Sequence, residues 1–373
     1  MSTDTAPFTT HLSASPAPAV GGLMPRLDQL ATWMRTQGLL PTGEPLTARR
    51  MAGGQSNPSW QLESESRHWV LRAKPAPAAT LLPSAHAIER EYRVLNALQG
   101  TAVPVPQVRA LCEDESVIGV AFYLMDFVQG RVFADPSLPD VPAKARAAYY
   151  DAAAQTLAAL HQVDWRARGL HDFGRHSGYF SRLVRRWSQQ YLASREQPVS
   201  AMERLMEWLP ANIPAEADGE AATCITHGDF RMENLMFHPE RPEVVAVLDW
   251  ELSTLGHPLS DLAYNALAWH MPAGILRGLA DLNLPALGLP IEADYVAAYC
   301  RRTGLDPAAL GRDWPFHLAF NLFRLAAILQ GIGQRERAGT ASNASAREIA
   351  ALAPTVAGWG WAFAQGHQPD LCT

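Results

Sequence analysis

Six segments of the chain carry apolar residues three or four positions apart, the spacing that gathers them on one face of a helix. The clearest stripe comprises Ile88, Tyr92, Leu95 and Leu98. The sequence predicts helices over residues 27–37, 84–99, 143–161, 179–193, 202–209 and 316–332. The last of these is apolar enough to be a helix buried in the core.

Short apolar runs separated by Gly, Pro and Asn predict strands in the first third of the chain and again near residue 235. The predicted strands are 46–51, 59–62, 69–72, 121–127, 224–226, 235–237 and 244–248. A β-rich part is thus followed by a mostly helical part, which predicts an α+β protein with two lobes. We expect a disordered tail over residues 1–22, a small antiparallel N-terminal lobe over 23–128 and a larger helical C-terminal lobe over 129–373.

Composition narrows the class of protein. The 373 residues are 48% hydrophobic and 18% charged, enough to bury a sizeable core. Lys and Arg total 31 against 37 Asp and Glu, so the formal charge of -6 offers no global basic field for nucleic acid. The four cysteines are scattered without the spacing of a zinc site, as expected for reduced thiols in the cytoplasm.

The sequence also gives expectations about membranes and location. The N-terminal residues lack the basic and apolar regions of a secretory signal. The apolar segment 316–332 is interrupted by His317, Asn321, Arg324 and Gln330, so it is expected to fall short of a membrane span. We therefore expect a cytoplasmic protein without membrane or nucleic-acid partners. The oligomeric state stays open.

Asp and Asn residues, whose side chains carry oxygen atoms that can bind a metal, flank the short strands near residue 235. Asp229 and Asn234 lie in the loop between two of these strands, and Asp249 directly follows a third. Hairpin pairing of the three strands would bring the side chains to one end of a small sheet. Such oxygen ligands suit Mg²⁺, and a positioned carboxylate can take the proton of an acceptor hydroxyl.

The N-terminal part holds weaker signals of phosphate binding. Residues 52–57 read AGGQSN, and the small residues Gly53, Gly54 and Ser56 would let backbone N–H groups approach a phosphate closely. The alternative is a simple tight turn between strands.

A cation and a carboxylate form a second candidate pair. Strand alternation places Arg72 and Lys74 on one face, and Glu91 falls on the core-facing stripe of its helix. A buried carboxylate needs a cation, and Arg72 is the proposed partner. The alternatives are a solvated sheet edge and a glutamate that reaches out to solvent.

The pattern HGDxxxxN followed by DWE resembles the aminoglycoside phosphotransferase family, whose fold is similar to that of protein kinases. This resemblance implies a two-lobed protein-kinase-like fold that uses ATP and Mg²⁺. It implies that Asp229 is the catalytic base and that Asn234 and Asp249 bind Mg²⁺. His227 is interpreted as a hydrogen-bonded structural residue. Asp261 would hold the catalytic loop through backbone N–H groups, or simply favour the start of its helix, near Leu259.

The resemblance extends into the N-terminal lobe. WVLR stands where kinases have V-A-I-K, which makes Arg72 the phosphate-contacting cation and Glu91 its partner on the helix. FYLMDFVQG would be the hinge, whose main chain near Asp126 and Val128 would meet adenine. The implied nucleotide-binding residues are Gly53, Gly54, Gln55, Ser56, Asn57, Arg72, Asp126 and Val128.

The segments GGQSNPSW, WVLRAKPAP, HAIEREYRVL and RRWSQQY resemble a subgroup of kinase-like domains fused to acyl-CoA dehydrogenases. This subgroup suggests a small-molecule hydroxyl acceptor with an acyl group, including CoA thioesters. His317 and Arg324 in the apolar segment 316–332, and the cluster Arg182, Arg185 and Arg186 beside Trp187, would suit an acidic or acyl acceptor better than a polycationic aminoglycoside. The alternative for the cluster is a solvated helix face. Alternatives for the whole chain are a silent nucleotide-binding regulatory module and an aminoglycoside antibiotic kinase.

Overall fold

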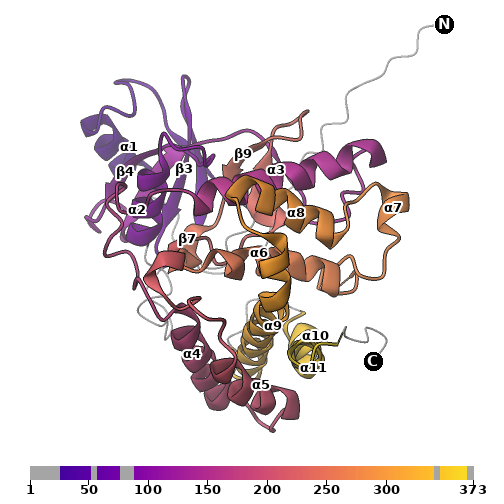
Figure 1. Cartoon of the computed structure of the whole chain (residues 1–373). Coiled ribbons are helices and arrows are strands. Elements are labelled where there is room, and N and C mark those ends of the chain that lie inside the picture. The colour runs from indigo at the N-terminus through magenta and orange to yellow at the C-terminus, as the bar shows by residue number, and fades with distance from the viewer. Residues whose placement is uncertain (1–25, 52–56, 76–87, 275, 340–344, 368–373) are drawn as a thin grey trace, which may run out of the picture. The chain divides into compact units, whose positions relative to one another are not determined.

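The protein is described by a computed structural model covering residues 26–51, 57–75, 88–274, 276–339 and 345–367 (Figure 1). The chain divides into two compact units. The first comprises residues up to 88 together with 109–127, and the second comprises 89–108 and 128–373.

Two groups of predictions concern residues outside these described ranges. The expected tail over 1–22 lies outside the described residues. The same holds for Gly53, Gly54, Gln55 and Ser56 of the predicted phosphate loop. The domain limits predicted from the sequence stay a prediction.

The first unit is built on a five-stranded sheet with the strand order β1-β2-β3-β5-β4. The strands are β1 (Thr47–Arg50), β2 (Ser59–Glu63), β3 (His68–Ala73), β4 (Val108–Cys112) and β5 (Phe122–Asp126). Strand β3 pairs antiparallel with β2 and β5, and this register sets Arg72 opposite Ser59 and Tyr123. The strands predicted in this part are confirmed, with slightly different ends.

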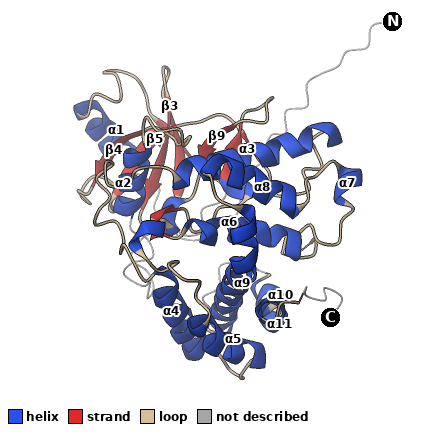
Figure 2. Cartoon of the chain, viewed as in Figure 1, coloured by secondary structure: helices blue, strands red, loops and turns tan. Residues whose placement is uncertain are grey.

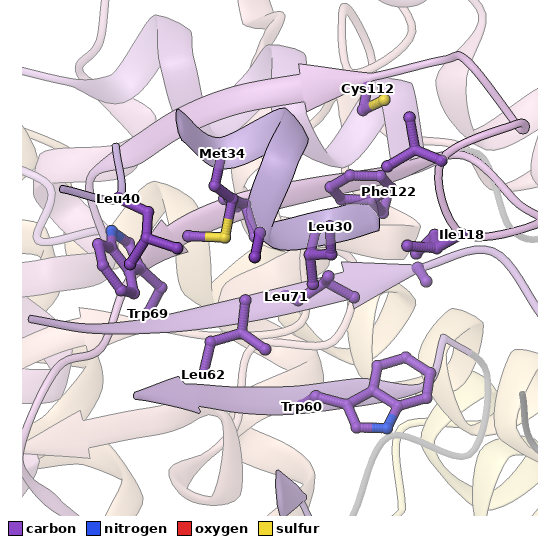
Figure 3. Close-up of a cluster of buried hydrophobic side chains, with 14 of the residues drawn as sticks. Leu30, Met34, Leu40, Trp60, Leu62, Trp69, Leu71, Cys112, Ile118 and Phe122 are labelled. Carbon is purple, nitrogen blue, oxygen red and sulfur yellow. The ribbon is translucent and has the colours of Figure 1, made fainter. Parts of the chain in front are cut away.

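Helix α1 (Leu27–Thr36) packs against one face of this sheet (Figure 3). Leu30 and Met34 from the helix and Leu71 from β3 are fully buried in the same apolar cluster. Full burial of a side chain of this size contributes about 1.5–3 kcal/mol. Because side chains alternate along a strand, Arg72 lies on the opposite face of β3 from Leu71.

The second unit is mostly helical (Figure 2). Its described α-helices are α2 (Ile88–Leu98), α3 (Ala143–His161), α4 (Tyr179–Ser194), α5 (Ser200–Ala211), α6 (Pro258–Ala266), α7 (Leu284–Leu287), α8 (Glu292–Thr303), α9 (Pro307–Arg337), α10 (Ala346–Ala351) and α11 (Ala353–Ala364). Helix α9 contacts α4, α5, α6, α10 and α11 and is the central helix of this unit.

Helix α9 extends well beyond the predicted segment 316–332. An 18-residue window within its portion Leu310–Arg337 has a mean hydropathy of 1.2, so this portion is long and apolar enough to cross a membrane by length and composition alone. The expectation that its polar interruptions rule this out on composition was therefore wrong. Since 78% of that window is buried inside the protein, the expected core helix is confirmed.

Two small sheets carry the polar loops of the second unit. Strand β8 (Leu235–Phe237) lies between β6 (Arg131–Val132) and β9 (Val244–Val247), and β7 (Cys224–Thr226) pairs antiparallel with β10 (Thr254–Gly256). The predicted hairpin of β8 and β9 is confirmed, but the inclusion of β7 in the same sheet was wrong. The loop after β7 contains the 3₁₀ turn Met232–Asn234, so it is no tight hairpin, and the returning chain supplies β10 as the partner of β7.

Candidate active site

The loop between β7 and β8 starts with a conformation that only glycine tolerates well. Gly228 has a φ of +83°, in the left-handed region. A Cβ atom built there would lie 2.7 Å from the carbonyl oxygen of Leu252. The glycine therefore lets the loop turn sharply and pass close to the segment that follows Asp249.

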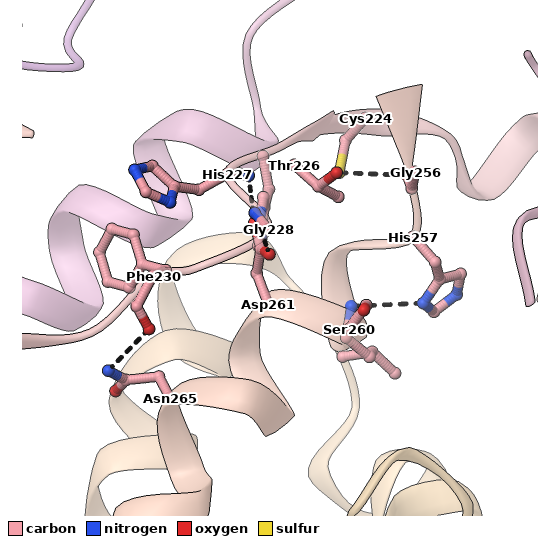
Figure 4. Close-up of polar contacts among 12 residues, drawn as sticks. Cys224, Thr226, His227, Gly228, Phe230, Gly256, His257, Ser260, Asp261 and Asn265 are labelled. Carbon is pink, nitrogen blue, oxygen red and sulfur yellow. Dashed lines mark hydrogen bonds and ion pairs between the residues drawn. The ribbon is translucent and has the colours of Figure 1, made fainter. Parts of the chain in front are cut away.

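Asp261 holds the start of this loop from the first turn of α6 (Figure 4). Its Oδ2 accepts the N–H of His227 at 2.5 Å, and its Oδ1 accepts the N–H of Gly228 at 2.9 Å. Burial raises the pKa of Asp261, but the hydrogen bond and charge of His161 and the backbone donors outweigh it, so the pKa is lowered. The predicted role of Asp261 in tying down the loop is confirmed.

Asp261 contacts the buried side chain of His161, which in turn contacts the buried side chain of Tyr299. Nε2 of His161 lies 3.4 Å from Oδ2 of Asp261, and Nδ1 of His161 lies 2.7 Å from the hydroxyl of Tyr299. His161 ends α3 and Tyr299 belongs to α8. Sequence reasoning missed both residues, since nothing local links them to the loop.

His227 connects the loop to the strand end that carries Asp249. Its Nε2 bonds to the carbonyl oxygen of Leu248 at 2.8 Å, and its Nδ1 accepts the N–H of Asp229 at 3.2 Å. These partners assign the neutral tautomer with the proton on Nε2. The fully buried ring is thus a structural residue, as predicted.

Both carboxylate oxygens of Asp229 are held in place. The hydroxyl of Tyr264 donates to Oδ1 at 2.6 Å, and Nδ2 of Asn234 donates to Oδ2 at 2.9 Å. Nε of Arg231 lies 3.4 Å from the same Oδ2. The side chain of Asp229 is 18% exposed, so it is oriented by its neighbours yet reachable from solvent.

Tyr264 was not predicted as a site residue, although it lies three positions after Asp261 on the same helix. Burial and the charge of Asp229 both raise its pKa, with burial the larger cause. The hydroxyl therefore keeps its proton and acts as a donor to the carboxylate. The i, i+3 spacing of the two residues in GHPLSDLAY was the available signal.

Asn234 and Asp249 are brought together by the backbone. The carbonyl oxygen of Asn234 accepts the N–H of Leu248 at 2.8 Å, directly before Asp249. Nδ2 of Asn234 is used by Asp229, which orients its Oδ1 as the remaining acceptor. Asp249 has φ 64° and ψ 64°, a sparsely populated conformation for a residue with a side chain.

These donors fit Mg²⁺ in kind. A carboxylate and an amide oxygen are hard ligands, and Mg²⁺ is usually bound by one or two protein groups together with substrate phosphates. Over the described ranges, no group of three or more His, Cys, Asp or Glu side chains could hold a metal by itself. Asn234 and Asp249 stay the predicted ligands of a magnesium ion.

A charged network next to Asp229 was also missed from the sequence. NH1 of Arg231 lies 2.9 Å from Oε2 of Glu233, and Arg277 pairs with the same carboxylate. Burial lowers the pKa of Arg231, but the negative charges of the nearby carboxylates, Asp229 first, outweigh it, so the pKa is raised. Arg231 therefore remains a full positive charge beside the proposed base.

The candidate site residues predicted in the N-terminal lobe are distributed over both units. Arg72 is half-buried on β3 of the first unit, and Glu91 is 2% exposed on α2 of the second. Their predicted ion pair spans the two units and stays a prediction. Asn57 is fully buried, and its carbonyl oxygen accepts the hydroxyl of Ser59 at 3.4 Å.

The segment predicted as the hinge, residues 122–130, contains the last residues of the first unit. Both oxygens of Asp126 are taken by Arg109, at 2.7 Å to Nε and 2.6 Å to NH2. The carboxylate is thus paired within the first unit, and the contact predicted at Asp126 is one through the main chain. Val128 begins the longer stretch of the second unit. The predicted contacts of both residues with adenine stay a prediction.

The three arginines clustered on α4 differ in their exposure to solvent. Arg185 and Arg186 are exposed and Arg182 is half-buried. The exposed pair is the solvated helix face that the sequence allowed as one interpretation. Trp187, the next residue on the helix, is half-buried.

Comparison with known proteins places this geometry in a family. The model of the phosphotransferase enzyme family matches residues 47–320. Acyl-CoA dehydrogenase family member 10 of Mus musculus is 45% identical over 341 residues, which cover 90% of this chain and 31% of the mouse protein. The chain thus spans about a third of the length of that relative.

Solved structures agree with the family match. A candidate aminoglycoside phosphotransferase from Ralstonia eutropha is 46% identical, with a TM-score of 0.81, covering 92% of this chain and 99% of that chain. A thermostable variant of aminoglycoside phosphotransferase APH(4)-Ia, in a ternary complex with ADP and hygromycin B, is 15% identical, with a TM-score of 0.57 over 91% of this chain and 98% of that chain. The second likeness shows the fold alone.

The predicted fold class, an α+β protein-kinase-like fold, is confirmed by these structures together with the antiparallel sheets and many helices of the two units. The resemblance to kinase-like domains of acyl-CoA dehydrogenase family members is confirmed as well. The chain therefore belongs to the phosphotransferase enzyme family.

Proposed function

We propose that this enzyme transfers the γ-phosphoryl group of ATP to a hydroxyl group of a small metabolite, with Mg²⁺ as the metal. The observation that carries the proposal is the geometry of Asp229, whose two oxygens are fixed by Tyr264 and Asn234 while the side chain stays reachable. A carboxylate fixed in this way can align an acceptor hydroxyl and receive its proton.

The other residues of the site have complementary roles. Mg²⁺, when bound, would neutralise the negative charge that develops on the transferred phosphoryl group. Oδ1 of Asn234 and the carboxylate of Asp249 are the donors suited to hold it. Asp261 and His227 keep the loop in the conformation that presents Asp229, because they bind the backbone N–H groups on either side of the turn.

ATP as donor is supported by the family match and by the ADP in the ternary complex of the APH(4)-Ia variant. Within the first unit, Arg72 with the loop at residues 53–57 would contact the phosphates, and the main chain of Asp126 would approach adenine. Glu91 would orient Arg72. These assignments rest on the motif positions in the chain.

The acceptor is a hydroxylated acyl group, as the free acid or as its CoA thioester. The support is the similarity of the chain to acyl-CoA dehydrogenase family members over 90% of its length. Hygromycin B belongs to a neighbour that is only 15% identical, so it lends little weight to an aminoglycoside acceptor here.

An acceptor screen tests the proposal. The protein is incubated with ATP, Mg²⁺ and a panel of hydroxy acids, hydroxyacyl-CoAs, amino alcohols and aminoglycosides, and ADP release is measured. We expect release above the no-acceptor background with a hydroxyacyl compound, and its loss in Asp229→Asn. Tight ATP binding by calorimetry without turnover on any acceptor would instead identify a silent nucleotide-binding module.

A further inference from the structure

A polar stripe on the buried helix α9 contacts the catalytic loop. His317, Asn321 and Arg324 lie at positions i, i+4 and i+7, one face of the helix. Nδ2 of Asn321 donates to the carbonyl oxygens of Ser260 at 3.1 Å and of His317 at 3.0 Å. The stripe thus fixes α9 against the start of α6 and places Arg324 at the loop.

Arg324 itself is only 6% exposed. Its NH2 donates to the carbonyl oxygen of Gly228 at 2.5 Å, one residue before Asp229. Its Cζ lies 5.1 Å from the ring centroid of Tyr264 and 5.9 Å from that of Trp187. Two aromatic rings therefore flank the guanidinium, which offsets part of the cost of taking the charge out of water.

Neither aromatic neighbour supplies a counter-charge, however. Within the part of the chain that the structure describes, Arg324 forms no ion pair with a carboxylate, and its one hydrogen bond uses one of five donor hydrogens. The buried indole Nε1 of Trp187 likewise has no acceptor among the described residues. A buried cation without an ion-pair partner and a second donor without an acceptor thus lie close together among the described residues. Such an arrangement is costly unless an anion completes it.

The geometry relates this cation to the proposed base. The guanidinium of Arg324 lies over the ring face of Tyr264, and the hydroxyl of Tyr264 donates its hydrogen bond to the carboxylate of Asp229. An anion held by Arg324 would therefore lie about one tyrosine ring away from the carboxylate that receives the acceptor's proton. A hydroxyl and an anionic group on one short molecule span such a separation.

We propose that Arg324, with Trp187 beside it, forms a subsite for an anionic group of the phosphoryl acceptor, namely a carboxylate carried on the same short chain as the reacting hydroxyl. This inference rests on the proposed function for its reaction but makes its own statement about binding. It predicts that the site prefers hydroxy carboxylates to amino alcohols, whose cationic groups Arg324 repels.

The test compares Arg324→Gln with Arg324→Lys. Glutamine keeps an N–H donor for the Gly228 carbonyl but removes the charge, whereas lysine keeps the charge. The matched control is Arg185→Gln, which removes an exposed arginine from α4. Each variant is assayed with short hydroxy acids carrying the hydroxyl on successive carbons, with the corresponding neutral amides, and with the CoA thioesters.

We expect Arg324→Gln to lower kcat/KM for the hydroxy acids by about 100-fold and to leave the neutral amides within a few fold of wild type. Arg324→Lys should retain most of the activity on the acids, and Arg185→Gln all of it. Equal losses on acids and amides would overturn the subsite, since Arg324 would then act only through Gly228. A wild-type preference for the thioester or the amide over the free acid would overturn it as well.

Binding measurements test the subsite independently of the proposed reaction. Calorimetry of the hydroxy acids with the wild-type protein and with Arg324→Gln should show binding that the variant loses by about the same factor. If the acids bind at Arg324 but no acceptor is phosphorylated, the proposed function fails and the subsite stands. If the acids do not bind to the wild-type protein, the subsite fails whatever the kinase assay shows.

Discussion

The hydroxyl of Tyr264 donates a 2.6 Å hydrogen bond to Oδ1 of Asp229, and it does so from the same helix that carries Asp261. Asp261 holds the backbone of the loop, and Tyr264 holds the carboxylate at its tip. Helix α6 therefore sets both the position and the orientation of the proposed base.

The first prediction concerns that hydrogen bond. Tyr264→Phe should lower kcat by about 10-fold with little change in the KM for ATP, because the carboxylate loses one of two fixed contacts, worth roughly 1–2 kcal/mol. Steady-state kinetics give both constants. Tyr150→Phe is the matched control, since it removes another buried tyrosine hydroxyl with a 2.6 Å bond, to Pro136. The control should lower thermal stability without lowering kcat, and an equal fall of kcat in both variants would contradict the role of Tyr264.

A second prediction separates backbone strain from steric collision at the turn of the loop. Gly228→Ala combines a positive φ with a Cβ that would meet the carbonyl of Leu252 at 2.7 Å. Gly304→Ala is the control, because its φ is +75° but no atom lies within 4 Å. Gly304→Ala should cost about 1 kcal/mol of stability and no activity. Gly228→Ala should cost more stability and most of the activity, as measured by thermal denaturation and turnover. Full activity in Gly228→Ala would show that the loop does not need this conformation.

Local patterns predicted much of this site. Asp229, Asn234 and Asp249 lie in one stretch of sequence whose short strands could be recognised, and Asp261 lies in the first turn of a recognisable helix. Local signals also located the helices α3 and α4 almost to the residue. Such features depend on neighbours along the chain, so one sequence is enough to predict them.

Two of the contacts that were missed from the sequence act across long separations. His161 reaches Asp261 from a position 100 residues earlier, and Arg324 reaches Gly228 from 96 residues later. The pairing of β7 with β10 likewise depends on the path of the chain between them. In α9, His317 and Arg324 were interpreted as suiting an acidic or acyl acceptor, but the contact of Arg324 with the loop was not predicted. The i, i+4, i+7 spacing of the polar residues marks the face that meets the site.

The third prediction concerns pH. His257 and His317 stack with ring centroids 5.4 Å apart, and burial, followed by the charge of His161, lowers the pKa of His257 to about 4. The pKa of His317 is lowered well below its usual value by burial and by His257. The unfolded chain binds protons to both residues below about pH 6.5, whereas the folded chain does not. Stability should therefore be unaffected by this pair above pH 6.5 and should fall as the pH drops from 6.5 towards 4.

His257→Asn tests this directly. Nδ1 of His257 accepts the N–H of Leu259 at the start of α6, and asparagine can make the same cap without titrating. Thermal denaturation between pH 7 and pH 4.5 should show a shallower loss of stability in the variant than in the wild type. Identical slopes for the two proteins would contradict the assignment to His257.

The central claim is the transfer of a phosphoryl group to an acceptor hydroxyl with Asp229 as the base, and label transfer measures it most directly. The protein is incubated with ATP labelled on the γ-phosphate, Mg²⁺ and a hydroxyacyl acceptor, and the label on the acceptor is quantified in the wild type and in Asp229→Asn. We predict labelled acceptor in the wild type, none when Mg²⁺ is removed, and a rate at least about 100-fold lower in the variant. Undiminished transfer by Asp229→Asn would contradict the account, as would release of the label to water alone with every hydroxyl acceptor.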